Sequence, residues 1–157
     1  WTESVLTAAF FAVEEAEHHE QPGALWGLNP SALNQEHVGS YGLPVPDDNR
    51  VLDMFETAFL EQPTVPILRA APAKVAAVGT KEIDIRMLVQ LSAFTVHATP
   101  EPLDGLTSAS QYIVKYAIPA TAKGRLLHQL KLLGVRRSTL FPDLENLARE
   151  LSARPTL

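Results

Sequence analysis

The sequence predicts an α+β fold, in which short mixed strands form one or two small sheets beside about five helices. Some segments repeat apolar residues at helical spacing, whereas others alternate apolar and polar residues with the period of a strand. The two kinds follow one another without the regular alternation of a parallel α/β sheet, and the sequence has no glycine-rich phosphate loop. The 157 residues suit a single domain, 1–157.

The first third is expected to begin with a helix at 4–17, whose exposed N–H groups Thr2 or Ser4 can cap. Its apolar stripe comprises Leu6, Ala9, Phe10, Val13 and Ala16. A second helix is expected at 50–60, with Asp48 or Asn49 as its cap. Between them the pattern predicts a short strand, a turn with one helical loop, and an irregular loop rich in Gly and Pro, at 24–29, 29–35 and 39–49.

The middle of the chain mixes both kinds of pattern. An edge strand is expected at 64–70, whereas 72–82 is ambiguous and is compatible with a loop that contains a short helix. Residues 82–91 predict a helix capped by Asp84, with an apolar stripe of Ile85, Leu88 and Val89. Residues 93–97 alternate with period two and predict a strand, and 98–110 form a turn-rich loop.

The last third contains the clearest strand, at 112–118. Pro119 suits the first position of the next helix, and Gly134 is expected to end it as a left-handed cap. The apolar face of that helix comprises Leu126, Leu127, Leu130 and Leu133. A final helix is expected at 138–151, with Pro142 in its first turn and a buried stripe of Leu144, Leu147, Ala148 and Leu151.

Composition excludes several classes of function. The net charge of −5 disfavours bulk attraction to nucleic acid or anionic lipid. The absence of cysteine excludes disulfides, thiolate zinc sites and a cysteine nucleophile. No apolar run reaches the roughly 18 residues that a membrane span needs. We therefore expect a cytoplasmic protein without a membrane partner, for which nucleic acid is an improbable ligand.

Two polar residues near the helix–strand junction are candidates for chemistry. Gln90 offers both a donor and an acceptor, so its amide could bind a ribose or a nicotinamide, or could tie down the next loop. His97 could act as a general acid or base, or could end a strand by holding a backbone carbonyl. The carboxylate nearest to this junction along the chain is that of Asp84.

Two other groups favour structural roles. His18 and His19 point about 100° apart on a helix, so they cannot readily share a metal ion, and no metal site is expected. Five residues that make the C-terminal half locally basic could contact phosphates, although a solvated helix face is the simpler interpretation: Lys123, Arg125, Lys131, Arg136 and Arg137.

Four segments resemble, in collinear order, motifs of the FRG-domain family. "WTESVLTAAFFAV" is similar to its "D-W-T-x-S-P-L-x-A-L-x-F-A-V" stretch, and "ALWGLNPSALN" to its "W-x-L-N-P-x-x-L-N" segment. "DIRMLVQLSAFTVH" resembles its "R-x-x-x-Q-x-G-x-F-T-x-H" block, with Ser92 in place of the usual Gly. The run that contains "TLFPDL" resembles the family's closing segment. The chain begins at the Trp of the first stretch, so we expect a piece of a longer domain that lacks the N-terminal Phe-Arg-Gly motif.

The resemblance implies a fold like that of ADP-ribosyltransferases, with NAD as substrate rather than as a bound cofactor. It places Trp1, Thr2 and Ser4 where a nucleotide-binding Ser/Thr motif would fall, and Gln90 and His97 in the catalytic block. Two hypotheses follow. The complete domain could bind NAD and transfer ADP-ribose, in which case this chain alone is expected to be weak or inactive. Alternatively, it could be a non-catalytic interaction module or inactive remnant, whose partner is a protein or the missing N-terminal segment.

Overall fold

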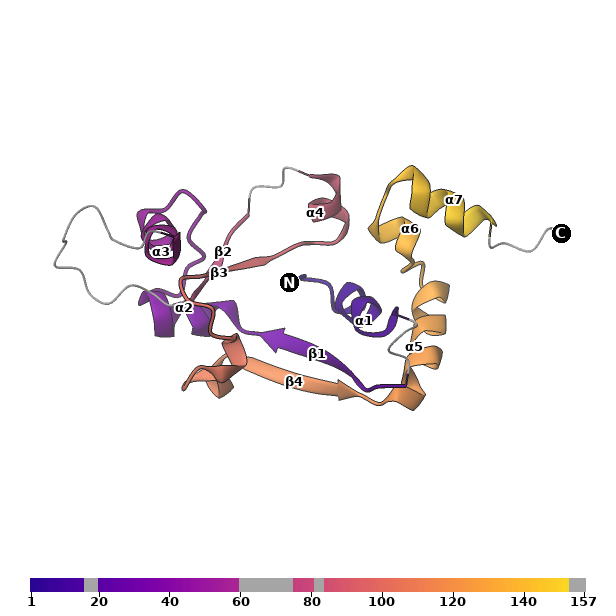
Figure 1. Ribbon diagram of the computed structural model, residues 1–157, viewed down its shortest axis with the longest axis horizontal. Helices are drawn as coiled ribbons and strands as arrows, with labels where there is room; N and C mark the ends of the chain where they lie inside the picture. The colour runs from indigo at the N-terminus through magenta and orange to yellow at the C-terminus, as the bar shows by residue number, and fades with distance from the viewer. Residues whose placement is uncertain (16–19, 60–74, 81–83, 153–157) are drawn as a thin grey trace. The chain divides into compact units, whose positions relative to one another are not determined.

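A computed structural model describes residues 1–15, 20–59, 75–80 and 84–152 of the chain (Figure 1). These residues contain seven α-helices and two two-stranded antiparallel sheets, which confirms the α+β class. They divide into two compact units, and the boundary between the units falls within both strands of one sheet. Unit 1 comprises 1–25, 82–92 and 116–157, and unit 2 comprises 26–81 and 93–115. Each unit is described separately below.

Unit 1 is built around two helices that pack against each other, α1 (Val5–Val13) and α5 (Ala120–Leu132). Ser4 caps α1, because its Oγ accepts a hydrogen bond from the N–H of Thr7 at 3.2 Å. The core of the unit consists of Ala9, Phe10, Val13, Leu130 and Leu140. Gly134 follows α5 with φ 82°, a left-handed conformation that glycine adopts without steric cost.

Three further helices complete unit 1: α4 (Ile85–Val89), α6 (Arg137–Leu140) and α7 (Leu144–Ser152). Asp84 caps α4 as predicted, with Oδ1 accepting from the N–H of Arg86 at 2.6 Å. The prediction of one helix at 138–151 was wrong, because Phe141, with φ −124° and ψ 86°, is outside the helical region, which a residue before proline disfavours. Pro142 therefore separates α6 from α7.

Several predicted core positions of unit 1 are exposed instead. Leu144 on α7 is 84% exposed, and its neighbours Leu147 and Leu151 are also exposed. The apolar stripe of α4 is not buried either, because α4 contains no buried residue. Leu133, beyond the end of α5, faces solvent although Leu130 is fully buried. Helical spacing identifies these apolar faces but not what covers them.

Unit 2 holds two apolar clusters on either side of one buried strand. This strand, β2 (Val75–Val78), pairs antiparallel with β3 (Phe94–His97), with Val75 opposite His97 and Val78 opposite Phe94. Val75 and Ala77 belong to the cluster that contains Leu33 and Tyr112, whereas Ala76 and Val78 belong to the cluster that contains Val51 and Met54. Successive residues of a strand point to opposite faces, so β2 is buried on both.

Two helices flank this sheet, α2 (Pro30–Val38) and α3 (Asn49–Phe59). Residues 29–35 were predicted as a turn with one helical loop, but Asn29 caps a complete helix there and Pro30 fills its first position. Asp48 supports the start of α3 by accepting from the N–H and guanidinium of Arg50. Hydrogen bonds from the Arg50 side chain and backbone lower the pKa of Asp48 to about 2.

Asn34, a fully buried residue of α2, links three segments of unit 2. Its Nδ2 donates to the carbonyl oxygens of Gly42 and Ala77, both at 2.8 Å, and its Oδ1 accepts from the N–H of Ala77 at 2.8 Å. The amide thus pairs with Ala77 in both directions, as a neighbouring strand would. It also holds the 39–49 loop, which was predicted to be irregular, against the core.

The second sheet pairs β1 (Gly23–Leu28) with β4 (Ile113–Ile118), which run in opposite directions (Figure 1). The predicted strands at 24–29, 93–97 and 112–118 are therefore confirmed. β2 was missed, because 72–82 was expected to be a loop with a short helix. The strand predicted at 64–70, together with Ala16, His18 and His19, lies outside the described residues.

Candidate functional site

The N-terminal turn and the turn around Gln90 meet in unit 1. The hydroxyl of Thr2 donates to the backbone carbonyl of Gln90 at 2.6 Å, and the N–H of Glu3 donates to the carbonyl of Leu91 at 2.9 Å. Thr2 and Ser92 also form an antiparallel bridge. Segments 88 residues apart are therefore joined.

The hydroxyl groups of this turn serve the start of α1. Thr2 Oγ1 accepts from the N–H of Ser4 at 3.0 Å, and Ser4 Oγ accepts from the N–H of Thr7. Such bonds satisfy N–H groups that a helix start leaves without partners. Trp1 precedes them, and 45% of this residue is exposed. Thr2 and Ser4 therefore stabilise the start of α1. A ligand that contacted their hydroxyl groups would bind to groups that already have this structural role.

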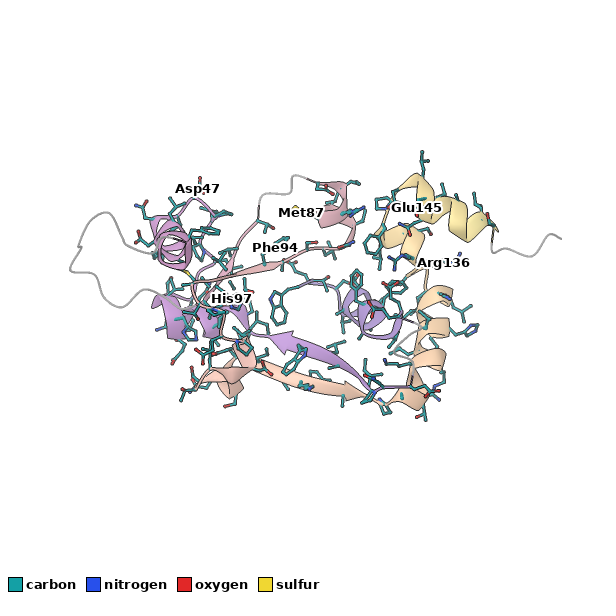
Figure 2. The ribbon with its side chains drawn as sticks, viewed as in Figure 1. Asp47, Met87, Phe94, His97, Arg136 and Glu145 are labelled. Carbon is teal, nitrogen blue, oxygen red and sulfur yellow. The ribbon has the colours of Figure 1, made fainter. Side chains whose placement is uncertain are left out.

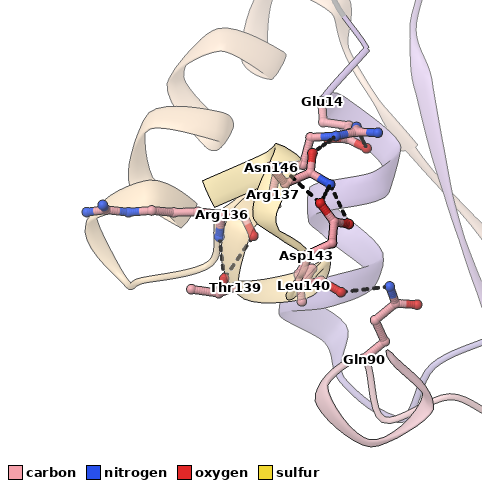
Figure 3. Close-up of polar contacts among 8 residues, drawn as sticks. All are labelled: Glu14, Gln90, Arg136, Arg137, Thr139, Leu140, Asp143 and Asn146. Atoms are coloured by element: carbon pink, nitrogen blue, oxygen red, sulfur yellow. Dashed lines mark hydrogen bonds and ion pairs between the residues drawn. The ribbon is translucent and has the colours of Figure 1, made fainter. Parts of the chain in front are cut away.

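Gln90 ends α4 and connects it to α6. Its Nε2 donates to the carbonyl oxygen of Leu140 at 2.9 Å, as Figure 3 shows. No described residue donates a hydrogen bond to its Oε1. The Gln90 side chain thus anchors the end of α6 through Nε2, and its Oε1 remains as a hydrogen-bond acceptor.

The strained residue of this turn is Leu91, with φ 47°, rather than Ser92. The N–H of Ser92 donates to the carbonyl of Met87 and that of Leu91 to the carbonyl of Leu88, the pattern of a Schellman motif. Glycine is the usual residue at the left-handed position of this motif, and its Cβ makes a leucine there costly. The substitution of Ser92 for the glycine of the FRG motif therefore falls one residue beyond the strained position.

Replacing Leu91 by Gly is expected to raise the free energy of unfolding by about 0.5–1 kcal/mol, because relief of the left-handed strain exceeds the entropy that glycine adds to the unfolded chain. The matched control, Ser92→Gly, adds that entropy without relieving strain and is expected to destabilise. Urea unfolding monitored by circular dichroism measures both changes. A stabilising Ser92→Gly would contradict this account.

His97 lies in unit 2, at the opposite end of β3 from Phe94 (Figure 2). Its Nε2 is 3.1 Å from Oγ1 of Thr95, which lies two residues earlier on the same face of the strand. Burial lowers the pKa of the His97 imidazole below its ordinary value. The lower pKa favours the neutral ring at pH 7, the form that can accept a proton.

A charged cluster around Phe141 was not recognised in the sequence. Arg137 on α6 donates from Nη1 to both carboxylate oxygens of Glu14 at 2.9 Å, and from Nε to Oδ1 of Asn146 at 3.1 Å (Figure 3). Asp143 accepts from the backbone and side chain of Asn146, and these bonds lower the pKa of the Asp143 carboxyl. The "TLFPDL" stretch is thus a polar turn as well as a packed one.

Arg86 belongs to the same cluster. Its Cζ lies 5.6 Å from the centre of the Phe141 ring, and that of Arg137 lies 4.9 Å from it. Arg86 Nη2 is 3.6 Å from Oδ2 of Asp143. Local sequence patterns indicate little of this arrangement, because Glu14 follows α1, Arg86 lies on α4, and the other residues come from α6, α7 and the turn between them. The arginine in the "R-x-x-x-Q" spacing was the one available clue.

Glu3 is a second residue that the sequence reasoning missed. Asp84 is the nearest carboxylate along the chain, but the backbone bond between Glu3 and Leu91 brings the exposed Glu3 beside the Gln90 turn. Within the described ranges, no group of three or more His, Asp or Glu residues is arranged to hold a metal ion. In the same part of the chain, no helix has the length and apolar character needed to cross a membrane.

The comparisons with known proteins leave the family assignment as a prediction. No protein-family model, curated protein or solved structure matches the chain. The FRG resemblance therefore depends on the four sequence motifs alone.

Proposed function

We propose that this chain is part of an FRG-like domain that binds an NAD-type dinucleotide beside the Thr2–Gln90 turn, and that the complete domain transfers ADP-ribose. The supporting observation is the 2.6 Å hydrogen bond from the Thr2 hydroxyl to the Gln90 carbonyl. It brings the residues that resemble two separate FRG motifs into contact. If the two motifs form one binding surface, their residues must lie close together. Two unrelated structural motifs have no such requirement.

The groups at this turn suit a nicotinamide nucleotide. Gln90 Oε1 can accept from the carboxamide NH2 of nicotinamide, since no described residue occupies it. The indole of the half-exposed Trp1 offers a flat apolar surface on which a nicotinamide or adenine ring can stack. Thr2 and Ser4 hold the turn in shape. Their part in binding is to position Trp1 and Gln90.

The proposed transfer breaks the bond between nicotinamide and C1′ of its ribose, with the electron pair leaving on nicotinamide. The acceptor then bonds to C1′ and gives up a proton. An anionic group near C1′ favours the cationic transition state. Glu3 is an exposed residue whose backbone N–H donates to Leu91 in the Gln90 turn, so we propose its carboxylate for this role.

Titration calorimetry with millimolar NAD tests the proposal, on this chain and on a protein extended upstream of Trp1. We expect heat of binding from both and release of nicotinamide from the extended protein. Gln90→Ala should weaken NAD binding by about five- to tenfold, as expected for loss of one hydrogen bond. Gln129→Ala, an exposed glutamine on α5, is the matched control and should leave the affinity unchanged.

Thermal unfolding of Gln90→Ala must accompany the titration, because the substitution also removes the bond to Leu140. If neither form of the wild-type protein binds NAD or releases nicotinamide, the proposed function is wrong. Equal effects of the two glutamine substitutions on NAD affinity would show that the Gln90 turn is not the binding surface.

A non-catalytic interaction module is the second candidate, favoured by the apolar face of α7. Leu144, Leu147 and Leu151 are exposed at the spacing of one helical stripe. Such a face commonly binds another protein surface. Light scattering over a range of concentrations, together with binding of an apolar fluorescent dye, tests this alternative. A strict monomer that binds no dye would contradict it.

A further inference from the structure

The Phe141 ring brings together two guanidinium groups that remain open to solvent. The side chains of Arg86 and Arg137 are 56% and 52% exposed, although both lie against the same ring. A guanidinium that stacks on an aromatic ring is held in a fixed plane while its N–H edge stays available. Both groups are therefore oriented in advance for an anion.

The two arginines are only partly neutralised. Arg137 uses Nη1 for Glu14 and Nε for Asn146, and its Nη2 donates to no described residue. Arg86 makes no side-chain hydrogen bond within the described ranges, and its one ion pair there, to Asp143, spans 3.6 Å. That carboxylate already accepts three hydrogen bonds from Asn146. Arg86 consequently has the positive charge with the least compensation in this cluster.

The cluster adjoins the proposed dinucleotide surface. The N–H of Gln90 donates to the carbonyl of Arg86 one helical turn earlier. The Gln90 side chain bonds to Leu140, which directly precedes Phe141 in the chain. Both arginines and Gln90 belong to unit 1, so their positions relative to one another are fixed within one compact body.

We propose that Arg86 and Arg137 form an anion site beside Phe141 that binds the pyrophosphate of the dinucleotide. This inference rests on the proposed function and deepens it. Two cationic groups on one ring suit an anion with two charged phosphates, and guanidinium groups match phosphate oxygens in geometry. Arg136 takes no part, because Figure 3 shows it pointing away from Glu14 and Asp143. Lys123, another of the basic residues in the C-terminal half, is buried.

Calorimetric titration of the full chain with inorganic pyrophosphate, ADP-ribose and NAD at low salt tests the site. Arg86→Ala is expected to weaken pyrophosphate and NAD binding by about tenfold or more, the effect of losing one charge-assisted hydrogen bond. Arg125→Ala removes the same charge from an exposed position on α5 and should change either affinity by less than about twofold. Arg86→Lys should restore part of the binding.

Arg86 is the informative position, because its exposed ion pair contributes little to folding, whereas Arg137 supports Glu14. If wild-type protein binds NAD but Arg86→Ala and Arg125→Ala weaken binding equally, the anion site is wrong and the proposed function stands. If pyrophosphate binds in an Arg86-dependent way but NAD does not bind, the anion site stands and the dinucleotide function is wrong. Absence of pyrophosphate binding to the wild-type chain overturns the site.

Discussion

Replacing Asn34 by Ala is expected to destabilise unit 2 by about 3–5 kcal/mol. The substitution removes three hydrogen bonds of 2.8 Å. It leaves the N–H and carbonyl of Ala77 without these partners in a buried strand, and each unsatisfied buried group costs about 1–3 kcal/mol. Because a domain is stable by only about 5–15 kcal/mol, most of unit 2 should lose its fixed packing.

Trp26 lies in unit 2 and Trp1 in unit 1, so the experiment can follow each unit. Urea unfolding is monitored by tryptophan fluorescence in a Trp1→Phe background, where Trp26 is the remaining indole. Asn29→Ala is the matched control on the same helix. Asn29 caps α2 through a single exposed hydrogen bond, and its loss should cost about 1 kcal/mol. Equal losses at the two positions would show that the Asn34 amide does not support β2.

Replacing Arg137 by Ala is expected to destabilise unit 1 by about 2–3 kcal/mol. The Glu14 side chain is only 13% exposed, and both of its oxygens accept from Arg137. Removing one partner of a buried pair leaves an uncompensated charge at a cost of about 3–5 kcal/mol. We reduce this range because Arg137 is half exposed, which lets water approach the carboxylate.

The double substitution of Glu14 and Arg137 by Leu separates the pair from the packing around it. If the cost of Arg137→Ala arises from the stranded Glu14 charge, the double variant should be more stable than the single one. Arg136→Ala is the control in the same segment and should have a smaller effect. Trp1 fluorescence in a Trp26→Phe background reports the unfolding. A double variant less stable than Arg137→Ala would contradict the electrostatic explanation.

Local patterns were sufficient for several elements. Period-two alternation identified β3, β-branched and aromatic residues identified β4, and the hydroxyl at Ser4 and the carboxylate at Asp84 identified the starts of α1 and α4. β2 escaped because its four residues are all apolar and buried on both faces, so no alternation marks them. Pro142 was assigned to a first helical turn, but it follows the end of α6 instead.

The candidate site could be predicted only through the family resemblance. Nothing in the spacing of Thr2 and Gln90 indicates contact, since 88 residues separate them. Tertiary packing brings the turn before α1 to the end of α4, and only then can this hydrogen bond form. The cluster around Phe141 was harder still, because a guanidinium stacks equally well on many rings, and the tertiary packing decides which one.

The pairing of the Asn34 amide with Ala77 has a consequence for solubility. A short strand of uncharged, small apolar residues is the type of segment that recruits strands from other molecules when its outer edge is open. On β2 a side chain from α2 already fills the hydrogen-bonding position at Ala77. An invading chain would first have to displace that helix. Intermolecular association through β2 is thereby coupled to local opening of the protein.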